Sequence, residues 1–92
     1  MKIPNKVKIG GHLYKVEFDK TPKEGTNRGQ NCGGFNRANG VISINDNLIK
    51  SEKEETFIHE ILHGMNSEFN ETVLDSLAQQ IYQVLKDNNL LR

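Results

Sequence analysis

Two histidines and a glutamate in the second half of the chain stand at a spacing that suits metal chemistry. The segment from His59 to His63 reads H-E-x-x-H, with Glu60 directly after the first histidine. Residues four apart lie one above the other on a helix, so both imidazoles can bind one ion. Glu60 lies about 100° round the helix from His59, where it can accept a proton from a water molecule without binding the metal. The pattern predicts a Zn²⁺ site with His59 and His63 as ligands and Glu60 as the catalytic base.

The residues after this motif separate the subclasses of zinc peptidase. The metzincin pattern continues as H-E-x-x-H-x-x-G-x-x-H, but Asn66 and Phe69 stand at its later positions, which excludes that class. The next predicted helix carries Glu71 and Asp75, and in this the chain resembles the gluzincins, where a glutamate on the following helix is the third zinc ligand. The resemblance implies that Glu71 binds the metal and that Asp75, one turn later, hydrogen-bonds His59.

More of the chain is similar to the compact, often prophage-encoded metallopeptidases near the ImmA/IrrE-type and minigluzincin groups. The likeness covers roughly residues 7–18 and 40–92, and its specific part is H-E-x-x-H together with Glu71 and Asp75. It implies a cytoplasmic enzyme of phage or prophage origin that acts on a protein or peptide substrate.

The helical pattern is compatible with these roles but leaves alternatives open. Glu71 and Asp75 share one edge of their helix beside its apolar stripe, and packing of that stripe against the preceding helix would bring Glu71 toward the histidines. Only seven residues separate His63 from Glu71, so the chain must reverse tightly between the helices. Glu68 is a rival ligand in this connection. Alternatively, Glu71 only stabilises a helix N-terminus and Asp75 is solvated.

Two helices are needed to position these side chains. Ser51 to Glu54 has the S-x-x-E form of a capping box, which predicts a helix from Ser51 to about Asn66. Asn70 is a favourable N-cap for a second helix that ends near Asp87. Its apolar residues recur at helical spacing; they are Val73, Leu74, Leu77, Ala78, Ile81, Val84 and Leu85.

The first half of the chain has the pattern of short strands. Residues 7–9 and 13–18 alternate apolar and polar side chains around Gly10-Gly11, which predicts a hairpin with a tight turn. Residues 32–36 and 41–44 are two further predicted strands, and Gly33-Gly34 leaves the backbone of the former open to close approach. The expected fold is α+β: a small antiparallel or mixed sheet of about three to four strands, then two packed helices, in one domain spanning residues 1–92. The polar segment 19–31 reads as a loop.

The strand Val41-Ile42-Ser43-Ile44 is a candidate for substrate binding. A strand near the zinc helix of gluzincin-like folds often pairs with an extended peptide, and an exposed sheet edge offers unpaired backbone groups for this. We therefore expect Val41, Ile42, Ser43 and Ile44 to form an edge strand. An ordinary core strand is the alternative.

Composition limits the other classes of function. Lys and Arg number 12 and so do Asp and Glu, but residues 1–50 carry a net charge of +5 and residues 51–92 a net charge of −5. This asymmetry favours two oppositely charged elements that pack together, and no nucleic-acid-binding motif accompanies the basic half. Cys32 is the only cysteine, which fits a reducing cytoplasm. No apolar stretch is long enough for a membrane helix, and no signal peptide is recognised.

The expected activity is hydrolysis of a peptide bond by metal-activated water. The alternative is a zinc-stabilised binding module that is inactive or barely active, because no side chain is an evident partner for the scissile carbonyl. The intact Glu60 favours the enzyme, since a purely structural zinc site needs no base. The sequence does not specify the substrate, the physiological metal or the oligomeric state.

Overall fold

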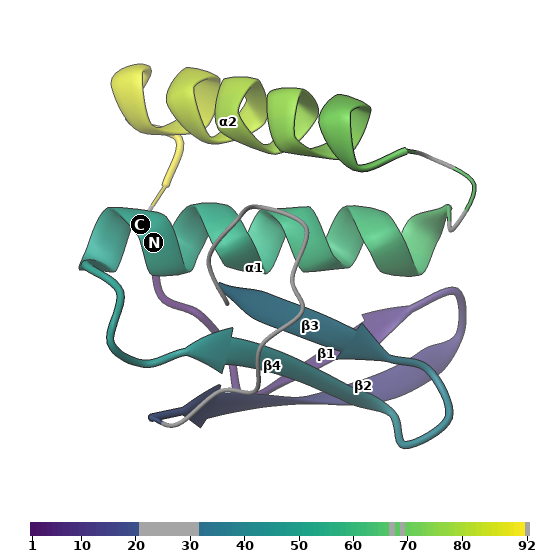
Figure 1. Ribbon diagram of the computed structural model, residues 1–92. Coiled ribbons are helices and arrows are strands. Elements are labelled where there is room, and N and C mark those ends of the chain that lie inside the picture. The colour runs from purple at the N-terminus through teal and green to yellow at the C-terminus, as the bar shows by residue number, and fades with distance from the viewer. Residues whose placement is uncertain (21–31, 67, 69, 92) are drawn as a thin grey trace.

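The computed structural model describes residues 1–20, 32–66, 68 and 70–91, and it has the expected α+β architecture (Figure 1). A four-stranded sheet is followed by two helices. The strands and helices are β1 (Lys6–Ile9), β2 (His12–Asp19), β3 (Gly33–Asn36), β4 (Val41–Asn45), α1 (Lys50–Met65) and α2 (Glu71–Asp87). Most of the predicted loop 19–31 lies outside the described residues, and Asp19 belongs to β2.

The β1–β2 hairpin forms as predicted. Its two strands pair antiparallel, with Ile9 opposite His12 across the turn. Gly10 and Gly11 have φ values of 59° and 85°, and a tight turn between right-twisted strands requires positive φ at both central positions. Glycine adopts this conformation without steric penalty, so the two glycines fix the turn and the register of the hairpin.

The expectation that residues Val41, Ile42, Ser43 and Ile44 form an edge strand is wrong. The strand order is β1-β2-β4-β3, so β4 pairs with β2 on one side and with β3 on the other. The pairing with β2 is parallel and joins residues far apart in the chain, for example Val16 and Ile42. Both backbone edges of β4 are therefore used within the sheet, and β3 stands at the end of the sheet instead.

The two helices form two further layers on one face of the sheet (Figure 1). Helix α1 packs on the sheet, and its Phe57 joins a core made of Ile9, Tyr14, Val16, Ile42 and Ile44. Close contact is possible because a glycine faces β3: a Cβ on Gly64 would come within 2.8 Å of the Phe35 ring. Helix α2 lies on the far side of α1, away from the sheet. Among the described residues, no helix combines the length and apolar character that crossing a membrane requires.

The two helices begin in different ways. Asn70 caps α2 as predicted, because its Oδ1 accepts a hydrogen bond from the backbone N–H of Val73 at 2.8 Å. The predicted capping box of α1 is wrong. Helix α1 begins one residue earlier, at Lys50, with Ile49 as its N-cap and no side-chain cap hydrogen bond. Ser51 therefore already lies within the first turn, and the Glu54 carboxylate is engaged elsewhere in the molecule.

Candidate metal centre

Helix α1 presents both histidines of the H-E-x-x-H motif toward α2. His59 is buried, with 3% of its side-chain surface exposed, and His63 one turn later is partly buried. Their ring centroids are 4.8 Å apart. A helical spacing of four residues therefore brings the two imidazoles side by side, as the sequence predicted.

The first turn of α2 brings the Glu71 carboxylate between the two rings. Glu71 Oε1 lies 2.6 Å from His63 Nε2, and Glu71 Oε2 lies 3.1 Å from His59 Nε2. One donor atom from each of the three residues lies within 4.8 Å of the others, which is a separation that a single metal ion can bridge. Of the two carboxylates considered as third ligand, the structure brings Glu71 to the histidines, whereas Glu68 is exposed in the connection and is not in this group.

Asp75 contacts the opposite side of the His59 ring. Its Oδ1 lies 3.0 Å from His59 Nδ1, while His59 Nε2 is turned toward Glu71. A carboxylate beside Nδ1 favours the tautomer that carries its proton there, and this leaves the lone pair of Nε2 available. With a metal ion at the site, this contact would orient His59 with Nε2 as the donor atom. The partnership was implied by the resemblance to the gluzincins.

The chemistry of the donor set fits a cation. Nε2 of a neutral histidine protonated on Nδ1 is an acceptor, and carboxylate oxygens accept as well, so their close approach requires a proton or a metal ion between them. Glu71 Oε2 is shielded from solvent and accepts no hydrogen bond from the residues that the structure describes. Two imidazole nitrogens and one carboxylate are a known ligand set of catalytic zinc. His59, His63 and Glu71 could therefore hold Zn²⁺.

Glu60 is buried between α1 and the end strand of the sheet. Glu60 is 5% exposed. A Cβ built on Gly33 of β3 would lie 3.4 Å from Glu60 Oε2. The same Cβ would come within 2.5 Å of the backbone oxygen of Ser43 and within 2.8 Å of Thr56 Cγ2. The prediction of a close approach at Gly33-Gly34 is wrong for Gly34, where a Cβ would meet nothing within 4 Å, and the close approach at Gly33 is confirmed. It allows the β3 backbone to pass beside the Glu60 carboxylate.

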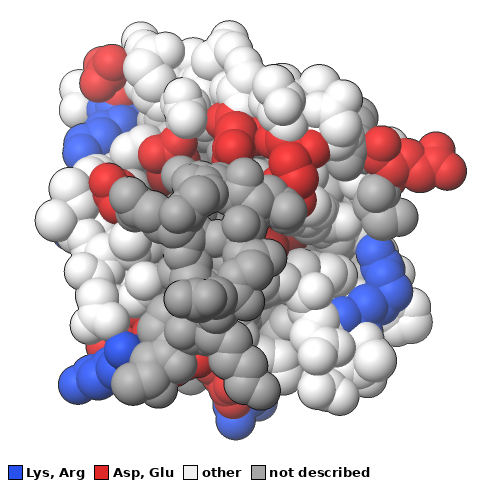
Figure 2. All heavy atoms as spheres, viewed as in Figure 1, with Lys and Arg blue, Asp and Glu red and all other residues white. Residues whose placement is uncertain are grey.

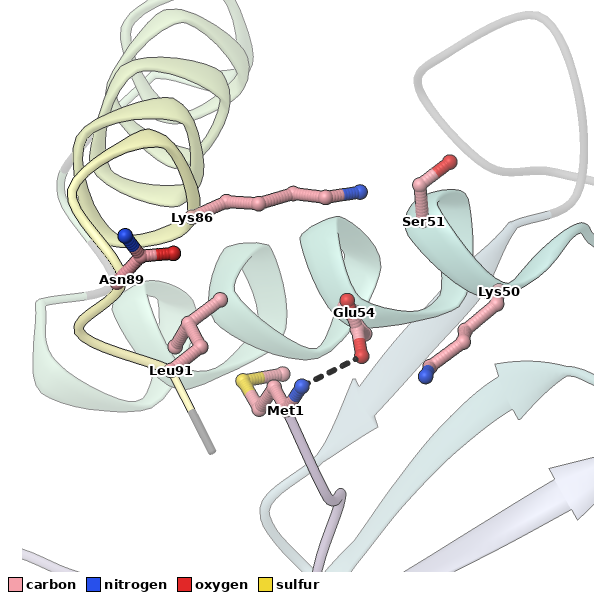
Figure 3. Close-up of a pocket in the computed structure, with 7 residues that line it drawn as sticks. All are labelled: Met1, Lys50, Ser51, Glu54, Lys86, Asn89 and Leu91. Atoms are coloured by element: carbon pink, nitrogen blue, oxygen red, sulfur yellow. Dashed lines mark ion pairs between the residues drawn. The ribbon is translucent and has the colours of Figure 1, made fainter.

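A second polar cluster, which the sequence did not reveal, lies toward the other end of α1 (Figure 3). Tyr82 of α2 donates a hydrogen bond to Glu54 Oε1, and the Met1 ammonium lies 3.1 Å from Glu54 Oε2. Glu54 and Tyr82 are both buried. A cavity of about 210 Å³ adjoins them; its lining residues are Met1, Lys50, Ser51, Glu54, Lys86, Asn89 and Leu91. Tyr82 is thus a packing residue that joins the two helices and is committed to Glu54.

This cluster shifts the titration of both partners. Burial raises the pKa of Glu54, but the hydrogen bond from Tyr82 and the Met1 ammonium outweigh this and hold it below its usual value. Burial, together with the hydrogen bond to Glu54, raises the pKa of Tyr82 to about 12. The fold therefore favours a charged Glu54 and a neutral Tyr82.

No known protein family, curated protein or solved structure matches this chain. The resemblance to the gluzincins therefore stays an expectation, supported only by the residues and their geometry.

Proposed function

We propose that this chain is a zinc-dependent peptidase of the gluzincin type. The observation that carries the proposal is the convergence of His59, His63 and Glu71 from two helices, with Asp75 on the far nitrogen of His59. A zinc ion held by these residues would polarise a peptide carbonyl and lower the pKa of a coordinated water. The proposed substrate is a protein or peptide in the cytoplasm; phage or prophage origin rests on the resemblance alone.

Each residue of the site has a defined part in the proposed reaction. Glu60 takes a proton from the attacking water and later delivers it to the leaving amine. Its burial beside β3 supports this role, because a carboxylate shielded from bulk water keeps its proton for the reacting groups. Asp75 positions His59 and does not touch the substrate.

The end strand β3 is the proposed docking edge for an extended substrate. Among the described strands, β3 has a neighbour on one side only, and Gly33 brings its backbone beside Glu60. A peptide that adds to this edge would form backbone hydrogen bonds with β3 and pass close to Glu60. This role replaces the one expected for β4.

One observation favours a second candidate, a zinc-stabilised binding module without activity. Tyr82, the tyrosine on the same helix as Glu71, is held by Glu54 and has no free hydroxyl to offer a substrate carbonyl. Such a module would bind zinc through the same three residues and would hydrolyse nothing.

Substitution Glu60→Gln separates the two candidates. We expect the variant to retain zinc and to lose at least about 10²-fold in hydrolysis of a broad peptide library, because it keeps the ligands and removes the base. Glu52→Gln, which removes an exposed carboxylate from the same helix, is the matched control and should cleave like the wild type. Zinc content and peptide cleavage are measured on the same preparations, with His63→Ala as the variant that loses the metal.

The outcomes distinguish the candidates cleanly. Zinc binding without cleavage by the wild-type chain would favour the binding module. Equal cleavage by the wild type and Glu60→Gln would overturn the proposed mechanism.

A further inference from the structure

The backbone of β3 directs alternate residues toward β4 and away from it. In an antiparallel pair of strands, every second pair of opposite residues exchanges backbone hydrogen bonds. The backbone N–H of Asn45 donates to the carbonyl of Cys32 at 2.7 Å, so Gly34, two residues further along, also directs its N–H and C=O groups at β4. The N–H and C=O groups of Gly33 and Phe35 therefore point outward, away from the other described strands.

A peptide that adds to this edge must pair with Gly33 and Phe35. Residues directly opposite each other on paired strands place their side chains on the same face of the sheet. Gly33 faces α1, since a Cβ built on it would lie 2.8 Å from Thr56 Cγ2. Phe35 faces α1 as well, because its ring lies close to Gly64. The peptide residue opposite Gly33 would thus lie beside Glu60, and the residue two positions along would lie beside Phe35.

The Arg37 side chain lies next to this second position. Its guanidinium carbon is 5.4 Å from the centroid of the Phe35 ring. Arg37 is exposed, and it forms no ion pair with any carboxylate in the part of the chain that the structure describes. A guanidinium can bind a carboxylate through two parallel hydrogen bonds. A group that lies against Phe35 would therefore meet an unpaired cation.

The charge differs between the two positions along this edge. Glu60, Glu71 and Asp75 surround the candidate metal centre, and three carboxylates outweigh the two charges of a Zn²⁺ ion. Figure 2 shows a row of acidic groups along the lower side of α2, whereas the basic groups on this face lie toward its margins. An acidic side chain of the peptide would be repelled beside Glu60 and attracted beside Arg37.

We propose that Arg37 determines substrate specificity by binding an acidic side chain on the peptide residue opposite Phe35. The inference rests on the proposed peptidase function and names its substrate class: an extended peptide with Asp or Glu two residues from the residue beside Glu60. A large apolar side chain would also contact the Phe35 ring, but it would replace water at the guanidinium without replacing its hydrogen bonds. A carboxylate fits this position better.

Digestion of a broad peptide library by the zinc-loaded wild-type chain tests the proposal. The products are identified by mass spectrometry and aligned on the cleaved bond, which fixes the register of each peptide. We expect Asp and Glu to be enriched about two- to fivefold at one fixed position relative to that bond, as is typical of an exposed ion pair. The enrichment should diminish in about 1 M NaCl, because salt screens exposed charges.

Three variants show whether Arg37 causes this preference. Arg37→Glu should favour Lys and Arg at the same position, because the charge at the edge is reversed. Arg37→Gln should lose the preference for acidic residues without acquiring one for basic residues. Lys8→Glu makes the same change of charge on β1, at the opposite edge of the sheet, and should keep the preference of the wild type.

The outcomes separate this inference from the proposed function. Cleavage with no acidic preference, or with the same preference in Arg37→Glu, would overturn the role of Arg37 and leave the peptidase standing. A zinc-loaded wild-type chain that cleaves no peptide would overturn both. Arg37 is exposed in a turn, so its substitution should be tolerated, and far-ultraviolet circular dichroism checks the fold. If Arg37→Glu fails to fold, loss of the preference in Arg37→Gln makes the test.

Discussion

The Asp75 carboxylate lies beside Nδ1 of His59, and we propose that this contact selects Nε2 as the donor atom. Its position 3.0 Å from Nδ1 leaves Nε2 directed at Glu71, and His63 presents Nε2 to the other oxygen of the same carboxylate. Without Asp75, Nδ1 of His59 would lose its carboxylate neighbour, and the ring would have fewer restraints on its tautomer and its rotation. The affinity of the proposed site should therefore depend on a residue that does not bind the metal.

Substitution Asp75→Asn tests this dependence. An amide offers a weaker partner to Nδ1 than a carboxylate, so we expect zinc affinity to fall about 10- to 100-fold while the fold is retained. Competition with a chromogenic zinc chelator measures the affinity. Asp87→Asn removes an exposed carboxylate from the last turn of the same helix, and we expect it to bind zinc like the wild type. Equal affinities in Asp75→Asn and Asp87→Asn would mean that Asp75 does not support the site.

Contacts between residues at regular spacing along one helix could be predicted from the sequence. Contacts between residues far apart in the chain could not. His59 and His63 are four apart, as are Glu71 and Asp75, so helical geometry alone places each pair on one edge. Glu54 and Tyr82 are 28 residues apart, and no local pattern connects them. Glu54 also resembled the last residue of a capping box, and tertiary contacts with Tyr82 and Met1 override that local role.

At the scale of elements, the missing side chain of Gly33 allows β3 to lie close to β4 and α1. Substitution Gly33→Ala should destabilise the chain by about 1–3 kcal/mol, because the added methyl group would press on the Ser43 backbone oxygen and on Thr56. Gly34→Ala is the matched control, since a Cβ at that position meets nothing within 4 Å. The free energy of unfolding is obtained from urea denaturation of both variants. A Gly33→Ala variant as stable as Gly34→Ala would show that the strand can shift without penalty.

Elements that depend on neighbouring residues were predictable, and the order of strands was not. Gly10-Gly11 identifies its hairpin because the turn needs positive φ, and Asn70 identifies the start of α2 because its side chain caps the next backbone amides. The placement of β4 in the interior of the sheet depends on parallel pairing with β2, about 26 residues earlier in the chain. The alternation within β4 is the same for an edge strand and an inner strand, so the sequence pattern could not separate them.

At the scale of the whole molecule, the buried Glu54–Tyr82 pair couples stability to pH. The pKa of Tyr82 is raised to about 12 in the fold, above the ~10 of an unfolded tyrosine. Neutral Tyr82 is therefore favoured by folding, and its contribution is complete below about pH 10 and is lost as the pH rises toward 12. For Glu54 the sign is reversed: its lowered pKa contributes stability above the usual carboxyl pKa, and this is lost as the pH falls through the lowered value.

Urea denaturation at a series of alkaline pH values tests the contribution of Tyr82. We expect the free energy of unfolding of the wild type to fall between about pH 10 and pH 12, and to fall less steeply in Tyr82→Phe, which has no proton to lose at this position. Tyr14→Phe removes the other tyrosine of the chain and serves as the matched control, with an alkaline transition like that of the wild type. Parallel curves for the wild type and Tyr82→Phe would contradict the coupling.

The three donor side chains of the candidate metal centre come from a stretch of only 13 residues, from His59 to Glu71, whereas the sheet needs partners from distant parts of the chain. The entropic penalty for bringing the ends of a chain segment together grows with the length of the segment. An ion bound by these residues would have to close only the short loop between His59 and Glu71. Zinc present during folding could therefore clamp the helical hairpin before the strands find their non-local partners. The order in which the chain acquires its structure would then depend on whether the ion is available when folding begins.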